Sequence, residues 1–208
     1  MYKNLIYFYN LYYLYYKTFQ MKFKNNNYLN FLLITLFLFS CTSKPDPFLI
    51  TKKSVGLLTD STLVKDLQLV FPNDSISKFI SGDEFLGDNN IIRIFDKESK
   101  KILLELNPKE SLDSLTTIQN IRIMDNRYRT NNSLNKICDF GCISRNYNVS
   151  NIQNTIKNLI ISVDEINAYF TIDKNELPEN LRSDMNLKIE ESSIPKSAKI
   201  KDFFIQWL

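Results

Sequence analysis

The sequence predicts an α+β fold in which an antiparallel β-sheet carries two helices on one face. Apolar and polar residues alternate over several short stretches, as they do in strands with one buried face. Two longer stretches instead place apolar residues at helical spacing. Because each helical stretch precedes a series of strand-like ones, we expect two successive α-β4-like halves, residues 48–126 and 127–208, within a single domain.

The first half is expected to open with a strand at residues 48–51 and a turn at residues 55–56. Ser61 or Thr62 can cap a helix that ends near Val70, because either hydroxyl can accept a hydrogen bond from a free amide of the first turn. The strands expected after this helix are residues 76–82, 91–95, 101–106 and 118–123, with a hairpin turn at residues 97–100.

The second half repeats this order. Residues 134–147 have helical spacing, with Ile137, Ile143 and Tyr147 among the apolar positions. Strands are expected at residues 159–163, 166–172, 187–190 and 199–208, with a turn at Asp164-Glu165 between the first two.

The segment that begins at Met21 is typical of a bacterial secretion signal. Lys22 and Lys24 supply a positive start, and residues 29–39 form an apolar run. A run of about ten apolar residues suits a signal sequence but is shorter than the ~20 residues that a membrane-spanning helix needs.

Residues 38–41, Leu-Phe-Ser-Cys, resemble the lipid-attachment motif of bacterial lipoproteins. We expect cleavage between Ser40 and Cys41 and attachment of acyl chains such as palmitate to Cys41, since two or three chains anchor a protein stably. The alternative is a plain N-terminal membrane anchor with a chance cysteine at its end. Residues 41–47 would form a tether to the domain, and Thr42, in place of Asp, favours the outer membrane.

Residues 1–20 do not fit this scheme, because they contain seven tyrosines and few aliphatic residues. We expect translation to start at Met21, so that residues 1–20 are an extension outside the protein. The alternative is an aromatic segment at the membrane interface, where Tyr is favoured.

The charge balance argues against a nucleic-acid-binding protein. Residues 1–40 contain four lysines and no acidic residue, and without them the 26 basic residues fall to 22, against 23 acidic ones. The rest of the chain therefore lacks the basic surplus that displaces counterions from phosphates. Histidine is absent, which excludes Ser-His-Asp and Cys-His catalysis and most zinc sites. We expect no enzyme activity, no cofactor and no metal.

Cys138 and Cys142 stand four residues apart and allow three interpretations. They are free, partly buried thiols, or a local disulfide in an oxidising envelope, or, with Asp139, half of a metal site that lacks its other ligands. In a continuous helix the two side chains would diverge, which disfavours the disulfide, whereas a loop would permit it.

Much of the arginine content lies in one region, at Arg122, Arg127, Arg129 and Arg145. Arg127, Tyr128 and Arg129 are candidates for holding an anionic ligand through guanidinium hydrogen bonds. The plainer interpretation is surface charge that faces acidic neighbours such as Asp125.

Two groups of acidic residues are interpreted as structural. Residues 81–90 are rich in oxygen ligands, but their spacing is not that of a calcium-binding EF-hand loop. Asp164 and Glu165 are expected to point apart in a turn. A hydrolase would need carboxylates from distant segments, such as Asp83 and Asp164, about 5–9 Å apart across a cleft.

Residues 50–59, with Ser61-Thr62, and residues 118–125, with 127–130, resemble uncharacterised envelope lipoproteins of the flavobacterial type. A weaker resemblance is to the sigma-E-regulated lipoprotein family of unknown function. Members commonly place a Gly after the position of Thr130, where this chain has Asn131-Asn132, so the local turn differs. The resemblance implies a lipid anchor and supplies no catalytic residue.

These observations lead us to expect a lipid-anchored envelope protein that acts by protein binding or scaffolding. Its expected partners are the membrane, through the N-terminal lipid, and another envelope protein, but no nucleic acid. The alternative is a small-ligand-binding lipoprotein with a pocket between the helices and the sheet, toward which Arg or Tyr side chains would converge.

Overall fold

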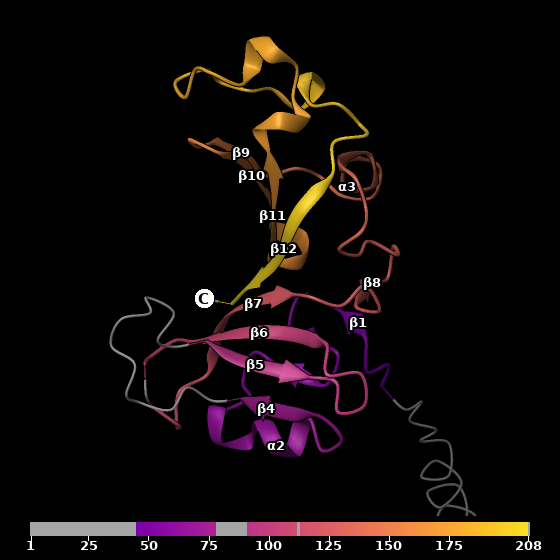
Figure 1. The fold of residues 1–208 in the computed structure, drawn as a ribbon, viewed down its shortest axis with the longest axis vertical. Coiled ribbons are helices and arrows are strands. Elements are labelled where there is room, and N and C mark those ends of the chain that lie inside the picture. Colours follow the sequence, from indigo (N-terminus) through magenta and orange to yellow (C-terminus); the bar gives the residue numbers. More distant parts are fainter. Residues whose placement is uncertain (1–44, 78–90, 112, 208) are drawn as a thin grey trace, which may run out of the picture. The chain divides into compact units, whose positions relative to one another are not determined.

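The computed structural model describes residues 45–77, 91–111 and 113–207 (Figure 1). From Pro45 onward the chain forms one compact unit. The expected signal sequence, Ser40, Cys41 and the acidic residues 81–90 lie outside the described residues. Within the described ranges, no helix is both long enough and apolar enough to cross a membrane.

An eight-stranded antiparallel sheet dominates the fold, which confirms the predicted antiparallel architecture and makes the protein mainly β. Its strands, in spatial order, are β4 (Ser75–Ser77), β5 (Ile92–Phe95), β6 (Ile102–Pro108), β7 (Ile118–Ile123), β12 (Ile200–Gln206), β11 (Ala168–Asp173), β10 (Asn158–Val163) and β9 (Asn151–Asn154).

The element order follows the predicted repeat of one helix and four strands. A 3₁₀ turn at Val64–Asp66 and helix α2 (Leu67–Val70) precede β4 to β7, and helix α3 (Phe140–Asn146) precedes β9 to β12. The last strands of the two halves, β7 and β12, pair with each other, with Ile205 opposite Ile121. One sheet therefore runs continuously through both halves (Figure 1).

Each half also contains an isolated β-bridge at the start of its helical segment. Leu63, the N-cap of the first helical turn, bridges Thr117 just before β7. Asp139, the N-cap of α3, bridges Lys199 just before β12. Each helix start is thus fixed to the start of the last strand of its own half.

A small second sheet is built from two-residue strands in the order β3 (Leu58–Thr59), β2 (Ser54–Val55), β1 (Leu49–Ile50) and β8 (Arg129–Thr130). The turn between β2 and β3 contains Gly56 at φ 59°, a conformation that glycine adopts without steric cost. A side chain there would also meet the carbonyl oxygen of Pro47. Pro47 therefore packs tightly on the domain, although the sequence placed it in the tether.

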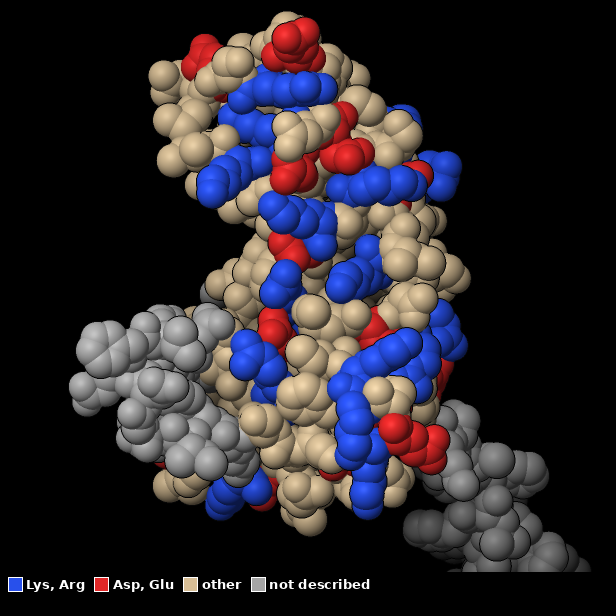
Figure 2. All heavy atoms as spheres, viewed as in Figure 1, with Lys and Arg blue, Asp and Glu red and all other residues tan. Residues whose placement is uncertain are grey.

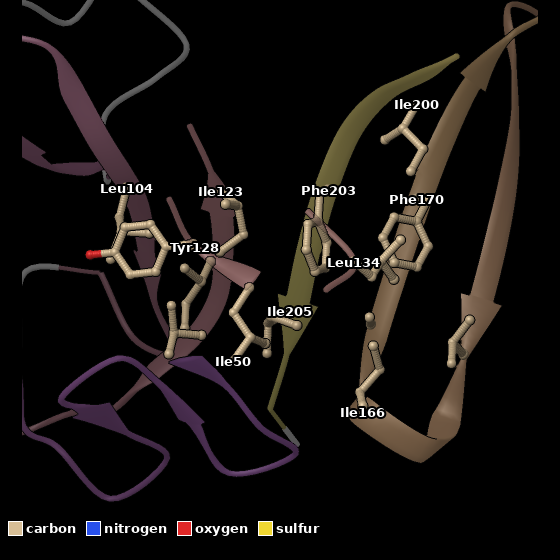
Figure 3. Close-up of a cluster of buried hydrophobic side chains, with 14 of the residues drawn as sticks. Ile50, Leu104, Ile123, Tyr128, Leu134, Ile166, Phe170, Ile200, Phe203 and Ile205 are labelled. Carbon is tan, nitrogen blue, oxygen red and sulfur yellow. The ribbon is translucent and has the colours of Figure 1, made fainter. Parts of the chain in front are cut away.

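The core follows the predicted alternation of the strands. In β10, Leu159, Ile161 and Val163 are buried while the residues between them are partly exposed. Figure 3 shows Phe203 of β12 beside Phe170 of β11, and their ring centroids are 4.6 Å apart. The same buried cluster includes residues of the small sheet and of both helices, among them Ile50, Val55, Leu58, Leu67, Phe140 and Ile143.

The expected layer of two helices on one face is not what the structure shows. Helix α2 has four residues and α3 has seven, and the small sheet contributes to the same core. The predicted helix at residues 134–147 begins only at Phe140. Ser133 has φ 60° and Asp139 is extended, so the chain before α3 follows turns. Ile137, expected on the apolar face, is 67% exposed.

Three strand predictions also need correction. Residues 187–190 form no strand, although Ile189 is buried beneath the 3₁₀ turns between β11 and β12. The strand predicted at 76–82 is described only as β4, because residues 78–90 lie outside the described ranges. Strand β9 was missed, since its sequence Asn-Ile-Gln-Asn gives no clear alternation.

Further 3₁₀ turns lie at Asp164–Ile166, Lys174–Glu176, Glu179–Leu181 and Glu191–Ser193. The first of them forms the predicted turn between β10 and β11. The last three belong to the long connection between β11 and β12, which is orange to yellow in Figure 1.

A ladder of charged and polar side chains joins five neighbouring strands of the large sheet. Glu105 of β6 accepts hydrogen bonds from Arg93 of β5 at 2.9 Å and from Arg122 of β7 at 3.0 Å. Arg122 also contacts Asp202 of β12 at 2.6 Å, and Asp202 accepts a hydrogen bond from Thr171 of β11 at 2.8 Å. Arg122 thus links the two halves and is engaged within the sheet.

Candidate functional site

The strongest candidate site is a small pocket with a volume of about 170 Å³, which we call the Arg127 pocket. Its walls are largely apolar, and three of its residues are charged: Asp74, Asp96 and Arg127. The lining residues are Pro47, Phe48, Leu57, Val70, Phe71, Pro72, Asn73, Asp74, Asp96, Leu103, Arg127 and Tyr128.

Each of the three charged residues lies in a turn next to a helix or a strand. Helix α2 ends at Val70, and after Phe71 and Pro72 the amide of Asp74 donates to the carbonyl of Phe71 at 3.3 Å. Asp96 begins the hairpin turn between β5 and β6. Arg127 follows β7 in a turn in which its own amide donates to Asp125 Oδ1 at 2.9 Å.

Arg127 is already engaged by carboxylates. Its Nε lies 3.0 Å from Asp125 Oδ1, and one of its terminal nitrogens lies 3.1 Å from Asp125 Oδ2 and 3.3 Å from Asp96 Oδ2. The hydrogen bond to Asp125 is the main reason why the pKa of Arg127 is raised. The guanidinium carbon also lies 4.7 Å from the centroid of the Phe48 ring. Arg127 therefore faces acidic neighbours such as Asp125, which is the plainer of the two interpretations of the sequence.

Tyr128 forms a wall of the pocket. Its side chain is 2% exposed, and its ring packs edge to face on Phe48 with centroids 5.2 Å apart. Figure 3 shows it among the core residues Leu104 and Ile123. Burial is the main cause that raises the pKa of its hydroxyl, so Tyr128 stays neutral at physiological pH.

Arg129, the third residue of the predicted ligand group, does not line the pocket. Its guanidinium lies 2.9 Å from Asp46 and donates to the carbonyl of Arg127 at 3.2 Å. Asp46 in turn accepts a hydrogen bond from the amide of Phe48 at 2.9 Å. Arg129 therefore fastens the end of the expected tether, at Asp46. Arg145 lies elsewhere, in the last turn of α3.

The two pocket carboxylates differ in their environments. Asp96 accepts hydrogen bonds from the amide and the hydroxyl of Ser99, and these bonds lower its pKa from 3.8 to about 2. Burial, and then the charge of Asp96, raise the pKa of Asp74 above 3.8. Within the described part of the chain, the Asp74 carboxylate accepts no hydrogen bond and forms no ion pair.

The pocket therefore has an acidic surplus. Asp74, Asp96 and Asp125 carry three negative charges in its lining and directly behind it, against the single positive charge of Arg127. Arg127 and Tyr128 were predicted from the sequence as site residues, whereas Asp74 and Asp96 were not. No local motif marks these two aspartates, because only the tertiary fold brings them together.

A second concavity is larger but more open. It has a volume of about 500 Å³ and is lined by Lys101, Ile102, Met124, Asp125, Asn126, Lys136 and Ile137. Lys136 donates to the carbonyl of Met124 at 3.4 Å. In the face that Figure 2 shows, basic and acidic side chains are interspersed and form no continuous basic stripe.

The remaining candidate residues that the structure describes do not line the Arg127 pocket. Asp164 and Glu165 lie in a 3₁₀ turn, where Glu165 accepts a hydrogen bond from the amide of Asn148 at 3.1 Å. Asp83, the other carboxylate of the hydrolase alternative, lies outside the described ranges. Among the residues described, no three His, Cys, Asp or Glu side chains are grouped to hold a metal ion. The sulfur atoms of Cys138 and Cys142 lie 2.7 Å apart without a bond between them.

Neither a protein-family model nor a curated protein matches this chain. Among solved structures, the chain is similar to the crystal structure of the uncharacterised protein YfeY from Escherichia coli. The two share 12% sequence identity over 76% of this chain and 99% of that one, with a TM-score of 0.49. This similarity assigns no functional residue, because that protein is itself uncharacterised.

Replacing Asp74 by Asn is expected to stabilise the domain at neutral pH. A carboxyl whose pKa is raised on folding opposes folding once it is ionised, so the substitution removes that cost. Because most of the carboxyl is solvated, we expect a gain of at most about 1 kcal/mol in the free energy of unfolding.

The measurement is urea unfolding of both proteins between pH 3 and pH 7 (the range over which aspartates titrate), with Asp66→Asn as a control outside the pocket. The gain should shrink as the pH falls through the raised pKa of Asp74 toward 3.8, where the wild-type carboxyl also becomes neutral. An Asp74→Asn variant that is less stable than the wild type at pH 7 would contradict this prediction.

Proposed function

We propose that this protein is a lipid-anchored envelope lipoprotein that binds another envelope protein by accepting a basic side chain in the Arg127 pocket. The observation that supports the proposal is the Asp74 carboxylate, which lines a largely apolar pocket and forms no ion pair among the described residues, although the charge of Arg127 acts on it. We infer the lipid anchor from residues 38–41 and from the resemblance to uncharacterised envelope lipoproteins. We infer the mode of binding from the pocket.

The size of the pocket favours a side chain over a free metabolite. Sites for small molecules usually enclose about 300–1,000 Å³, whereas this pocket has about 170 Å³. A single long side chain needs less room, and its aliphatic stem can lie along the apolar wall of Phe48, Phe71 and Leu103. A protein partner therefore fits the pocket better than a cofactor-sized ligand does.

The charge of the pocket favours Lys or Arg over an anionic group. Arg127 directs its guanidinium at Asp125 and Asp96, so it offers little to an incoming anion. Burial is the main cause that raises the pKa of Asp74, and repulsion by Asp96 raises it further. A cation placed between these two carboxylates relieves that repulsion, which would lower the pKa of Asp74. The original hypothesis of an anionic ligand at residues 127–129 is thereby replaced by that of a cationic one.

The lipid anchor would hold this pocket close to the membrane. Asp46 and Pro47 contact the folded domain, and Pro47 lines the pocket. Asp46 lies five positions after the expected lipid-bearing Cys41, and a chain over that distance in sequence spans at most about 18 Å. With Cys41 as the anchor, the partner is therefore a protein that presents its basic side chain near the bilayer surface.

The small-ligand alternative is supported by one observation. The pocket lies between residues at the end of α2 and the β5–β6 hairpin, which is the predicted kind of place for a ligand. A small aliphatic amine has the chemistry of a lysine side chain and would occupy the same space. Native mass spectrometry of the purified protein separates the two, because a retained amine would appear as a defined added mass.

Metabolic labelling with an alkyne analogue of palmitate is expected to label the wild-type protein and not Cys41→Ser. Cys138→Ser serves as the matched control and should keep the label, because only the cysteine that becomes the new N-terminus is acylated. The measurement is in-gel fluorescence after coupling of a dye to the alkyne. An unlabelled wild type, or a Cys41→Ser variant labelled to the same extent, would refute the lipid anchor.

A photo-crosslinking side chain at position 57 is expected to form a covalent adduct with the partner in living cells. Leu57 lines the pocket and is 42% exposed, so a benzophenone there would face the bound protein. The same group at Ile156, which is 73% exposed outside the pocket lining, is the matched control and should give no such adduct.

Combining the position-57 crosslinker with Asp74→Asn should reduce the adduct about tenfold, as expected when ~1.4 kcal/mol of binding free energy is lost. Because this substitution is expected to stabilise the fold, loss of the adduct would not result from unfolding. An adduct whose yield is the same with Asp74 and with Asn would contradict a role for the carboxylate.

A further inference from the structure

We propose that Cys138 and Cys142 form a disulfide that fastens the segment before α3 to the first turn of that helix. The two sulfur atoms lie 2.7 Å apart, only about 0.7 Å beyond the length of a disulfide bond. The inference rests on the envelope location proposed above, because disulfides persist in oxidising compartments. It does not depend on the function of the Arg127 pocket.

The backbone around Asp139 explains why the sulfur atoms meet. Within one continuous helix, cysteines at this spacing would point apart. Here Asp139 is the N-cap of α3 with φ −109° and ψ 177°, so the chain is extended immediately before the helix. This bend places the Cys138 sulfur beside that of Cys142, the third residue of α3. Because the chain is not helical before Phe140, the divergence of side chains expected in a continuous helix does not occur here.

The positions of both cysteines are fixed by hydrogen bonds. The Asp139 carboxylate accepts from the amide of Cys142 at 3.0 Å. On the other side, the amides of Phe140 and Gly141 donate to the carbonyls of Ala198 and Lys196 at 2.8 and 2.7 Å. Because this backbone is held at both ends, closing the disulfide needs only a small adjustment of the two side chains.

Each sulfur atom has the other as its main partner. Apart from Cys142, Cys138 Sγ has one further contact, at 4.0 Å from the carbonyl oxygen of Ser133. Both side chains are partly buried against the hydrophobic core. With no ligand group of three or more Cys, Asp or Glu in the described residues, the metal interpretation lacks support, whereas pairing satisfies both sulfur atoms.

The oxidant that we propose is a thiol–disulfide oxidoreductase of the envelope in its disulfide form. Burial raises the pKa of Cys142 to about 11, so Cys142 is a protonated thiol at neutral pH and the first attack falls to Cys138. The Cys138 thiolate attacks the disulfide of the oxidant and forms a mixed disulfide. Cys142 then loses its proton, displaces the oxidant as a dithiol and closes the bond. The protein loses two hydrogen atoms, and the oxidant gains them.

The direct test is peptide mapping of the full chain purified from the envelope fraction. Free thiols are first blocked with an alkylating reagent, without reductant, and the protein is then digested with trypsin. Cleavage after Lys136 and after Arg145 releases one peptide, residues 137–145, that contains both cysteines. We expect this peptide to be unalkylated and two hydrogen atoms lighter than the dithiol form, and to take up two alkyl groups only after reduction.

The conformational effect is tested with the double variant Cys138→Ser/Cys142→Ser. Under native conditions, reductant should accelerate trypsin cleavage after Lys136 several-fold in the wild type and leave the rate of the double variant unchanged. The variant without reductant should match the reduced wild type, and both should retain the same folded circular dichroism spectrum. Equal effects of reductant on the wild type and the variant would overturn the proposal.

The possible results also distinguish a failure of the disulfide proposal from a failure of the proposed envelope location. Protein that carries the Cys41 lipid but yields residues 137–145 fully alkylated without reduction refutes the disulfide and leaves the anchor intact. Protein that stays in the cytoplasm without lipid refutes the location. In that case oxidation of the purified full chain by a thiol–disulfide oxidoreductase decides the disulfide, and failure of the two sulfur atoms to pair there overturns it.

Discussion

The pairing of β7 with β12 is the constraint on which the rest of the structure depends. Each half of the chain is a short helical segment followed by four antiparallel strands, and such a meander alone has two open edges. Pairing between the last strands of both halves joins two four-stranded sheets, β4–β7 and β9–β12, into one sheet of eight strands. Arg122 reinforces this junction, because it contacts Glu105 of one half and Asp202 of the other.

The candidate site lies where Pro47 and Phe48 meet the residues that follow α2 and β7. Asp46 pairs with Arg129, and Pro47 packs over Gly56, so the last two residues of the expected tether are fixed to the domain. The pocket next to this contact combines apolar walls with the unpaired carboxylate of Asp74. Under the proposed function, attachment to the membrane and recognition of a partner would therefore share one region of the protein.

The sequence predicted the strands that alternate strictly, such as 159–163, because burial of one face determines both their pattern and their pairing. It failed at residues 134–139, where apolar spacing suggested helix but local hydrogen bonds and a positive φ at Ser133 favour turns. Arg127 was identified in advance, since clustered arginines are visible in a sequence. Its pairing with Asp96, 31 positions away, depends on tertiary structure that no local pattern encodes.

Under the proposed function, Asp74, which forms no ion pair within the described residues, pairs with a cation supplied by the partner. The most direct measurement is an NMR titration of the Asp74 side-chain carboxyl, in the free protein and with a short peptide that contains Lys and Arg. The account predicts a titration midpoint above 3.8 in the free protein and a lower midpoint once the peptide is bound. A midpoint at or below 3.8 in the free protein, or one that the peptide leaves unchanged, would contradict it.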